Sequence, residues 1–199
     1  MVTKYILNSG GINNSADQGS RFFNEMVKDL GAEPRILMCH FAQQREDWEI
    51  KYQKYIDSMI AVLSSSVRPR FEMAWPDQFA SQVQKSDVVY IHGGDEQLIQ
   101  YRMRAYHLPS VWEGKVVATK SASSHLLSKY YWTCDWRQCA AGLGILPIKF
   151  LAHYQSEYGG NNPRGPIDWE QARKQLEKYG DTSLPVHALK EGDYIVINV

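Results

Sequence analysis

The sequence predicts a three-layer α/β/α fold around a central, mostly parallel sheet. Short apolar runs alternate along the chain with amphipathic segments of helical length. Parallel strands joined by right-handed crossovers leave helices on both faces of the sheet. The 199 residues contain no internal repeat, and this length suits one domain. We therefore expect residues 1–199 to form a single α/β domain.

Apolar runs indicate the strands, and apolar residues that recur on one face indicate the helices. The strands are expected at Lys4–Asn8, Arg35–Cys39, Arg70–Trp75, Asp87–His92, Lys115–Thr119 and Ile148–Ala152. The helices are expected at Ser20–Leu30, Asp47–Leu63, Asp95–Tyr106, Ala122–Trp132 and Ile167–Tyr179. The chain is expected to end with a hairpin made of Val186–Leu189 and Tyr194–Asn198 around the turn at 190–193.

Glycine and proline support several of these boundaries. Gly10-Gly11 follows the first strand, Gly31 follows the first helix, and Pro166 precedes the last helix. The first helix carries Phe22, Phe23, Met26, Val27 and Leu30 on one face. The second carries Trp48, Tyr52, Tyr55, Ile56, Met59 and Leu63 on one face. Both patterns are typical of helices that cover a sheet.

Charge and composition exclude several classes of protein. Hydrophobic residues make up 44% of the chain and charged residues 22%, which is ordinary for a globular protein. Lys+Arg and Asp+Glu both number 22, so we expect no nucleic-acid partner and no membrane-surface partner. The apolar run Tyr5–Leu7 is too short for a signal peptide, and no run is long enough to span a bilayer. The three cysteines favour reduced thiols, and we expect a cytoplasmic protein.

The strongest chemical signal lies at the end of the strand expected at Lys115–Thr119. Ser121 follows that strand, and small residues then open a helix, which is the arrangement of a nucleophile elbow. The elbow usually has glycine two residues before and two residues after the serine, where this chain has Thr119 and Ser123. Taken alone, the motif is weak and is better explained by a serine that caps a helix.

Other strand ends supply residues that a serine nucleophile needs. His153 follows the strand Ile148–Ala152 and is the expected general base. In elbow enzymes the chain order is serine, acid, histidine, and Asp135 is the one acidic residue between Ser121 and His153. Gly93 and Gly94 follow a neighbouring strand, and the Ala122 amide lies at a helix start. These three amides are the expected oxyanion donors.

At this point the sequence resembles the peptidase E (aspartyl dipeptidase) and cyanophycinase group of serine peptidases. The resemblance is carried, in chain order, by Tyr5–Gly11, Val88–Asp95, Lys120–Ser124, Gly142–Pro147 followed by Ala152–Tyr154, and Leu184–Val199. It implies a class I glutamine-amidotransferase-like, flavodoxin-like fold. It also implies that Ser121 is the nucleophile and His153 the base. Asp135 falls about where peptidase E places its acidic member, and Gly93, Gly94 and Ala122 would border the oxyanion.

The chain departs from the family pattern at four positions near this site. Thr119 and Ser123 replace elbow glycines, His92 replaces a glycine, and Asp95 replaces an asparagine. Asp95 either caps the next helix or adds negative charge near the oxyanion, which would oppose catalysis. Lys120, beside the serine, either favours anionic substrates or is simply solvated.

We therefore expect a serine hydrolase that cleaves a small peptide or isopeptide amide, with N-terminal aspartyl dipeptides implied by the resemblance. The alternative is a non-catalytic binding or regulatory relative on the same fold, for which the lost glycines would be the signature. A glutaminase-like subunit ranks last because the elbow holds serine, not cysteine. No residue pattern requires a metal or an organic cofactor. The expected partner is a small peptide substrate, and a homodimer is left open.

His125 and the loop at 155–166 each have two possible interpretations. His125 lies one helical turn past Ser121 and competes with His153 for the role of base, although a packing or surface histidine is the simpler interpretation. The loop at 155–166 directly follows His153. It either shapes and covers the site or serves as a connector.

Overall fold

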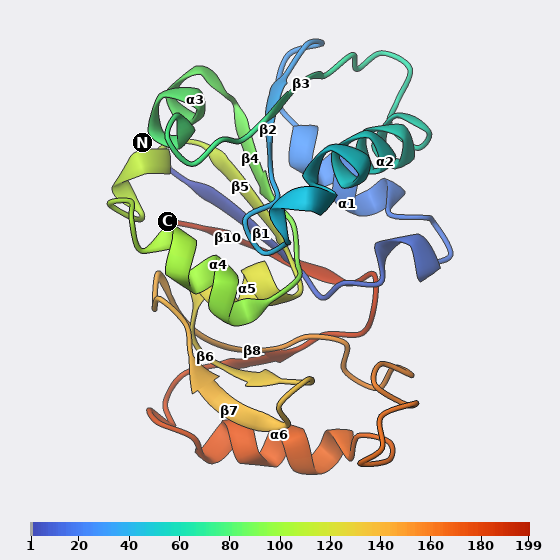
Figure 1. Cartoon of the computed structure of the whole chain (residues 1–199), viewed down its shortest axis with the longest axis vertical. Coiled ribbons are helices and arrows are strands. Elements are labelled where there is room, and N and C mark those ends of the chain that lie inside the picture. Colours follow the sequence, from blue (N-terminus) through green and yellow to red (C-terminus); the bar gives the residue numbers. More distant parts are fainter. Residues whose placement is uncertain (1) are drawn as a thin grey trace.

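Two sheets form the framework of the molecule, and Figure 1 shows them one above the other. The computed structural model describes residues 2–199. The larger sheet has the strand order β10-β1-β5-β4-β2-β3. Its strands are β1 (Lys4–Asn8), β2 (Arg35–Cys39), β3 (Arg70–Met73), β4 (Val88–Ile91), β5 (Val116–Lys120) and β10 (Tyr194–Asn198). All neighbours pair in parallel except β10, which runs antiparallel to β1.

Helices cover both faces of the larger sheet, so its inner strands β1, β5, β4 and β2 are largely apolar and buried. Side chains alternate between the two faces: Ile6 packs with α1 (Ser20–Val27) and α2 (Trp48–Ile60), whereas Tyr5 and Leu7 belong to the opposite cluster. That opposite cluster also takes residues from α3 (Phe79–Lys85), α4 (Glu96–Met103) and α5 (Ala122–Leu127). The α/β class and the mostly parallel sheet expected from the sequence are confirmed.

The smaller sheet follows α5 in the chain and has the order β7-β6-β8-β9. Its strands are β6 (Ser128–Thr133), β7 (Gln138–Ala141), β8 (Leu146–Leu151) and β9 (Val186–Ala188). Trp132 and Leu151 pack with Ala172 and Leu176 of α6 (Trp169–Lys178), which covers the outer side of this sheet (Figure 1). On the inner side, Phe150 joins the cluster that contains α5. The packing of α5 therefore connects the two sheets.

Two sequence expectations were wrong. The helix expected at Ala122–Trp132 ends at Leu127, because the β-prone residues 128–133 form β6. The closing hairpin does not form. Instead, β9 pairs with β8 in the smaller sheet and β10 pairs with β1 in the larger sheet. The turn between them, at residues 190–193, therefore crosses from one sheet to the other.

Among residues 2–199, no helix is long and apolar enough to cross a bilayer. The free cysteines are Cys39, Cys134 and Cys139, and the first two are buried.

A buried lysine fastens α6 to the smaller sheet. Lys149 of β8 is fully buried, and its Nζ donates to the carbonyl oxygens of Leu176 (2.9 Å) and Glu177 (2.8 Å) at the end of the helix. Helix C-terminal carbonyls lack partners within the helix and carry partial negative charge, so an ammonium group suits this position.

Replacing this ammonium should destabilise the fold. In Lys149→Met the apolar stem remains, but two carbonyl oxygens lose their donor, so we expect the free energy of unfolding to fall by about 1–3 kcal/mol in denaturant titration. Lys178→Met, an exposed lysine at the same helix end, is the control and should change it by less than about 0.5 kcal/mol. Equal effects from the two variants would contradict this account.

Candidate active site

Ser121 occupies a strained turn between β5 and α5. Its backbone has φ 52° and ψ −114°, a conformation that L residues rarely adopt. Hydrogen bonds hold it there: its N–H donates to the Asn8 carbonyl (2.9 Å), and its own carbonyl accepts from the amides of Ser124 (2.8 Å) and His125 (3.1 Å). A sharp strand-to-helix turn of this kind is what a nucleophile elbow requires.

The hydroxyl residues at the two elbow glycine positions fit without obstructing the turn. Ser123 Oγ accepts from the Lys120 amide (2.8 Å) and donates to the Ile91 carbonyl (2.6 Å). Thr119 Oγ1 lies 2.9 Å from Ser124 Oγ, which itself donates to Asn8 O (2.9 Å). These hydroxyls are fully buried, and each has a partner, so the close contact of strand and helix is kept.

The imidazole of His153 meets the Ser121 hydroxyl. Ser121 Oγ is 2.9 Å from His153 Nε2. The His153 backbone also has a positive φ, 58°, and its N–H donates to Ser9 Oγ (2.6 Å), which in turn donates to the Leu189 carbonyl (2.7 Å). Ser9, at the end of β1, therefore fixes the backbone that carries the imidazole.

A carboxylate holds the other imidazole nitrogen, and it belongs to Glu191. His153 Nδ1 is 2.8 Å from Glu191 Oε1, and Asn14 Nδ2 donates to Oε2 (3.2 Å). With Nδ1–H donating to this carboxylate, Nε2 is left to accept the Ser121 proton. Burial lowers the pKa of His153 below its usual value, and the hydrogen bond and charge of Glu191 partly offset that effect.

Asp135, the acid expected from chain order, does not contact His153. It is exposed in the turn between β6 and β7, and its Oδ1 accepts from the Tyr158 hydroxyl (3.0 Å). The expectation is corrected because it assumed that the acid precedes the histidine in the chain. Here the acid follows the histidine by 38 positions and returns to it through the pairing of β10 with β1.

Two glycines after β1 make room for this pair. A Cβ at Gly10 would lie 2.5 Å from His153 Cε1, and a Cβ at Gly11 would overlap the Glu191 carboxylate. Both positions also have positive φ. Gly10 O accepts from the Gly192 amide (2.8 Å), which fixes the turn that presents Glu191. The Gly-Gly step after the first strand was thus the sequence signal that could have pointed to this turn.

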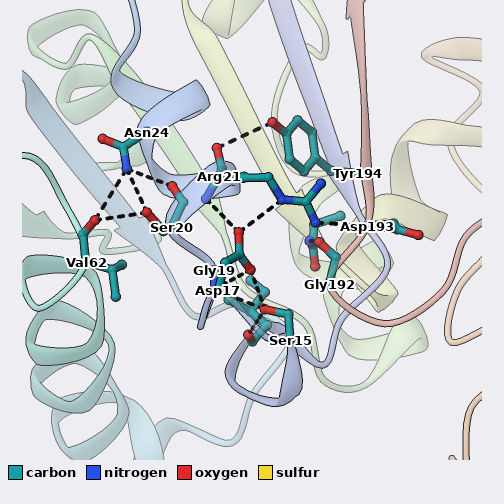
Figure 2. A network of polar contacts seen from close by, with 12 residues as sticks. Ser15, Asp17, Gly19, Ser20, Arg21, Asn24, Val62, Gly192, Asp193 and Tyr194 are labelled. Atoms are coloured by element: carbon teal, nitrogen blue, oxygen red, sulfur yellow. Dashed lines mark hydrogen bonds and ion pairs between the residues drawn. The ribbon is translucent and has the colours of Figure 1, made fainter.

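A polar network supports the same turn from the other side, as Figure 2 shows. Asp17 accepts from the backbone N–H (3.0 Å) and Nε (3.1 Å) of Arg21, and the Arg21 guanidinium reaches Asp193 at 4.0 Å. Tyr194 donates its hydroxyl to the Arg21 carbonyl (3.4 Å). The hydrogen bonds that the Asp17 carboxylate accepts lower its pKa to about 2, and the bond from the Arg21 backbone N–H has the largest effect. The residues beside Glu191 are therefore anchored to the start of α1.

Gly93 lies beside the elbow, whereas a Cβ at Gly94 would lie 2.2 Å from the Ala42 carbonyl oxygen. A Cβ at Gly93 would lie 2.6 Å from the Lys120 carbonyl and 3.2 Å from Ser121 Cβ. Within residues 2–199, no group accepts a hydrogen bond from the Gly93 or Gly94 amide. Ala122 is the first residue of α5, so its amide has no acceptor within the helix. Asp95 caps α4 by accepting from the amides of Gln97 and Leu98 (both 2.8 Å).

His125 and His92 both pack against aromatic rings. His125 Nδ1 lies 2.6 Å from Glu96 Oε1, and its ring stacks on Tyr131 at 4.6 Å, so the partners of its imidazole are Glu96 and Tyr131 rather than the Ser121 hydroxyl. His92 is fully buried and stacks against Tyr55 (4.1 Å) and His40 (4.4 Å). Within the described chain, neither His92 nor His40 has a hydrogen-bond partner on its ring nitrogens.

The described residues include no group of three or more His, Cys, Asp or Glu side chains placed to hold a metal ion. Lys120 directly precedes Ser121 in the chain, and its Nζ lies 5.1 Å from the centroid of the Tyr55 ring. Its charge acts on His153 in the same direction as burial, lowering the pKa of the imidazole.

Comparison with known proteins supports the architecture. No protein-family model and no curated protein matches the chain. A solved peptidase structure from an acI-B1 Actinobacterium is 16% identical, with a TM-score of 0.67 over 99% of this chain and 84% of the other. A Listeria monocytogenes EGD-e structure, named as a putative peptidase E protein, is 11% identical, with a TM-score of 0.63 over 100% and 95%. At these identities the likeness is one of fold: the chain has a peptidase E-like α/β architecture.

Loss of the Glu191 charge should alter the chemistry of His153 in two ways. In Glu191→Gln we expect the rate at which Ser121 reacts with an organophosphonate to fall by about 10²- to 10⁴-fold. Because the carboxylate raises the pKa of His153, its removal should also shift the acid limb of the pH–rate profile to lower pH. Asp135→Asn should cost less than about tenfold. A larger loss in Asp135→Asn than in Glu191→Gln would refute the geometric assignment.

The buried histidine pair should make stability depend on pH. Burial lowers the pKa of His40 to about 4 and holds that of His92 well below its usual value, whereas an unfolded histidine titrates near 6.5. The unfolded chain therefore binds more protons below about pH 6.5, and the folded state loses stability as the pH falls. His92→Phe, which keeps a ring in the stack, should reduce this slope by about 1.4 kcal/mol per pH unit in denaturant titrations at pH 5–6. An unchanged slope would show that His92 does not titrate this way.

Proposed function

We propose that this protein is a serine hydrolase that cleaves a small peptide or isopeptide amide through an acyl-enzyme. The observation that carries the proposal is the continuous chain Ser121 Oγ–His153 Nε2 (2.9 Å) and His153 Nδ1–Glu191 Oε1 (2.8 Å). A nucleophile, a base and an orienting acid in this geometry are the elements of a serine hydrolase triad. The fold likeness to structures named as peptidases supports the same class of reaction.

The proposed acylation follows from this geometry. Ser121 Oγ attacks the substrate carbonyl carbon while its proton passes to His153 Nε2. Charge develops on the carbonyl oxygen, to which we expect the amides of Gly93, Gly94 and Ala122 to donate. The C–N bond then breaks, and His153 delivers the proton to the leaving amine. Glu191 keeps Nδ1 protonated and stabilises the imidazolium during both transfers.

Deacylation repeats the sequence with water as the nucleophile. His153 Nε2 takes a proton from water as the water oxygen attacks the acyl ester. The ester C–O bond breaks, and the proton returns to Ser121 Oγ, which releases a carboxylic acid. Because burial keeps the pKa of His153 low, the imidazole is neutral and ready to accept a proton at neutral pH.

The substrate proposal is an amide whose acyl part carries an acidic group, with N-terminal aspartyl dipeptides as the first candidates. Lys120 supports it, because this residue directly precedes the nucleophile and its ammonium lies over an aromatic face, not beside a carboxylate. The free cysteines support a cytoplasmic location. The non-catalytic alternative receives less support, since Thr119 and Ser123 fit the elbow with their hydroxyls paired.

A serine-selective fluorophosphonate probe tests the proposal. We expect the native protein to be labelled and Ser121→Ala not to be. Hydrolysis of aspartyl dipeptides should fall by roughly 10⁴-fold or more in the same variant. Ser58→Ala, an exposed helical serine, is the control and should label normally. If the native protein is not labelled and cleaves no aspartyl or other dipeptide, the hydrolase proposal fails and the non-catalytic reading is favoured.

A further inference from the structure

A tyrosine from the loop after β8 covers the histidine of the proposed triad. The Tyr158 ring stacks on the His153 ring with centroids 4.2 Å apart and an interplanar angle of 24°. The His153 side chain is only 9% exposed, although it lies at the end of a strand and beside an exposed loop. No other aromatic ring in the described chain stacks on this imidazole. The stacking therefore accounts for part of the shielding of His153 from water.

The position of Tyr158 is set by its hydroxyl. The hydroxyl donates to Asp135 Oδ1 (3.0 Å), and Asp135 belongs to the exposed turn between β6 and β7. Burial, with the neighbouring carboxylate of Asp135 as the next cause, raises the pKa of Tyr158, so the phenol keeps its proton and remains a donor. The ring is thus fixed at one end by a charge-assisted hydrogen bond and at the other by the backbone.

Two arginines fasten the rest of the loop to the same turn. Arg164 donates to the Asp135 and Trp136 carbonyls, and Arg137 donates to the carbonyls of Arg164, Gly165 and Pro166. Ser156 holds the other end of the loop. Its amide donates to the His153 carbonyl (3.1 Å), and its carbonyl accepts from Trp169 Nε1 (3.1 Å). These contacts attach the loop that carries Tyr158 to the turn between β6 and β7 and to the backbone of His153.

We propose that Tyr158 is a positioning residue for His153, and that Asp135 acts on the site through the Tyr158 hydroxyl. This inference rests on the proposed hydrolase function for its catalytic meaning. The ring limits rotation of the imidazole about its side-chain bonds and keeps water from one face of it. Asp135 then contacts Tyr158 and sets the position of its ring, while Glu191 is the carboxylate that bonds to the imidazole.

A simpler reading is that Tyr158 only packs a loop against the surface. The two interpretations differ in whether the Tyr158 hydroxyl has a role. Loop packing needs the ring area alone, whereas positioning through Asp135 predicts that the hydroxyl and the carboxylate act as one unit. A double-mutant cycle between the two residues therefore separates them.

The experiment measures His153 directly and then its reactivity. The imidazole is titrated by NMR in the wild type, Tyr158→Leu, Tyr158→Phe, Asp135→Asn and the double variant Tyr158→Phe/Asp135→Asn, with its signal assigned from the spectrum of His153→Gln. The rate of Ser121 labelling by the fluorophosphonate probe is measured against pH for the same set. Tyr101→Leu, an exposed tyrosine on α4, is the matched control.

The titratable or charged groups that face His153 are otherwise unchanged across these variants. They are Glu191 from the turn before β10, Lys120 from β5, His125 from α5 and Glu96 from α4. In Tyr158→Leu, where Asp135 is unchanged as well, a change in the titration of His153 is therefore attributable to the stacked ring.

We expect Tyr158→Leu to raise the pKa of His153 toward its usual value, because the ring no longer excludes water. The acid limb of the labelling profile should move to higher pH with it, and the plateau rate should fall by about 2- to 10-fold, the range for loss of an aromatic pair. Tyr158→Phe should keep the titration near that of the wild type while lowering the plateau rate. Asp135→Asn should lower the plateau rate by a similar factor.

The decisive comparison is the double variant. If Asp135 acts through the hydroxyl, adding Asp135→Asn to Tyr158→Phe should lower the plateau rate no further. A further loss, or an unchanged His153 titration in Tyr158→Leu, overturns the proposal. The NMR titration requires no turnover. Absence of labelling in the wild type would therefore count against the hydrolase function, while the titration would still decide whether Tyr158 shields the imidazole.

Discussion

The antiparallel pairing of β10 with β1 is the contact on which the candidate site depends. Asn8, the last residue of β1, pairs with Tyr194, the first residue of β10, and this places the turn at 190–193 against Gly10 and Gly11. The glycines supply space, and the Gly10 carbonyl bonds to the turn backbone. As a result, Glu191 reaches an imidazole that another part of the chain supplies. A side chain on either glycine would displace His153 or Glu191.

Local sequence patterns were sufficient for the elements but not for their partners. The runs at Lys4–Asn8 and Arg35–Cys39 have the bounds of β1 and β2, because strands buried on both faces are apolar throughout. The sequence also predicts that the segments of β9 and β10 are extended, but the prediction that they pair with each other is wrong. Adjacent extended segments suggest a hairpin, whereas here each pairs with a distant strand in a separate sheet. Nothing within a short window records such long-range pairing.

The same limitation explains the mixed outcome at the site. Ser121 and His153 were expected together because each follows a strand, and both strands were assigned to one sheet edge. The structure does bring the two side chains together, although β5 and β8 belong to different sheets. The carboxylate could not be placed with them, since Glu191 lies in a turn whose location depends on the pairing of β10. Asp135 was singled out by chain order and by the family resemblance, and its neighbour in space, Tyr158, comes from a loop without regular structure. The elbow substitutions Thr119 and Ser123 were also hard to judge beforehand, because the effect of a buried hydroxyl depends on whether it finds a partner.

The serine and the histidine belong to different sheets, and the acid lies on the segment that crosses between them. A nascent chain that has completed only residues 1–120 would have most of the larger sheet but neither reactive group, and one that stops before residue 190 would have a hydroxyl and an imidazole without the carboxylate. The proposed chemistry therefore becomes available only when the final ten residues have joined the first strand. The topology itself would therefore withhold the proposed activity from partly synthesised or partly unfolded forms.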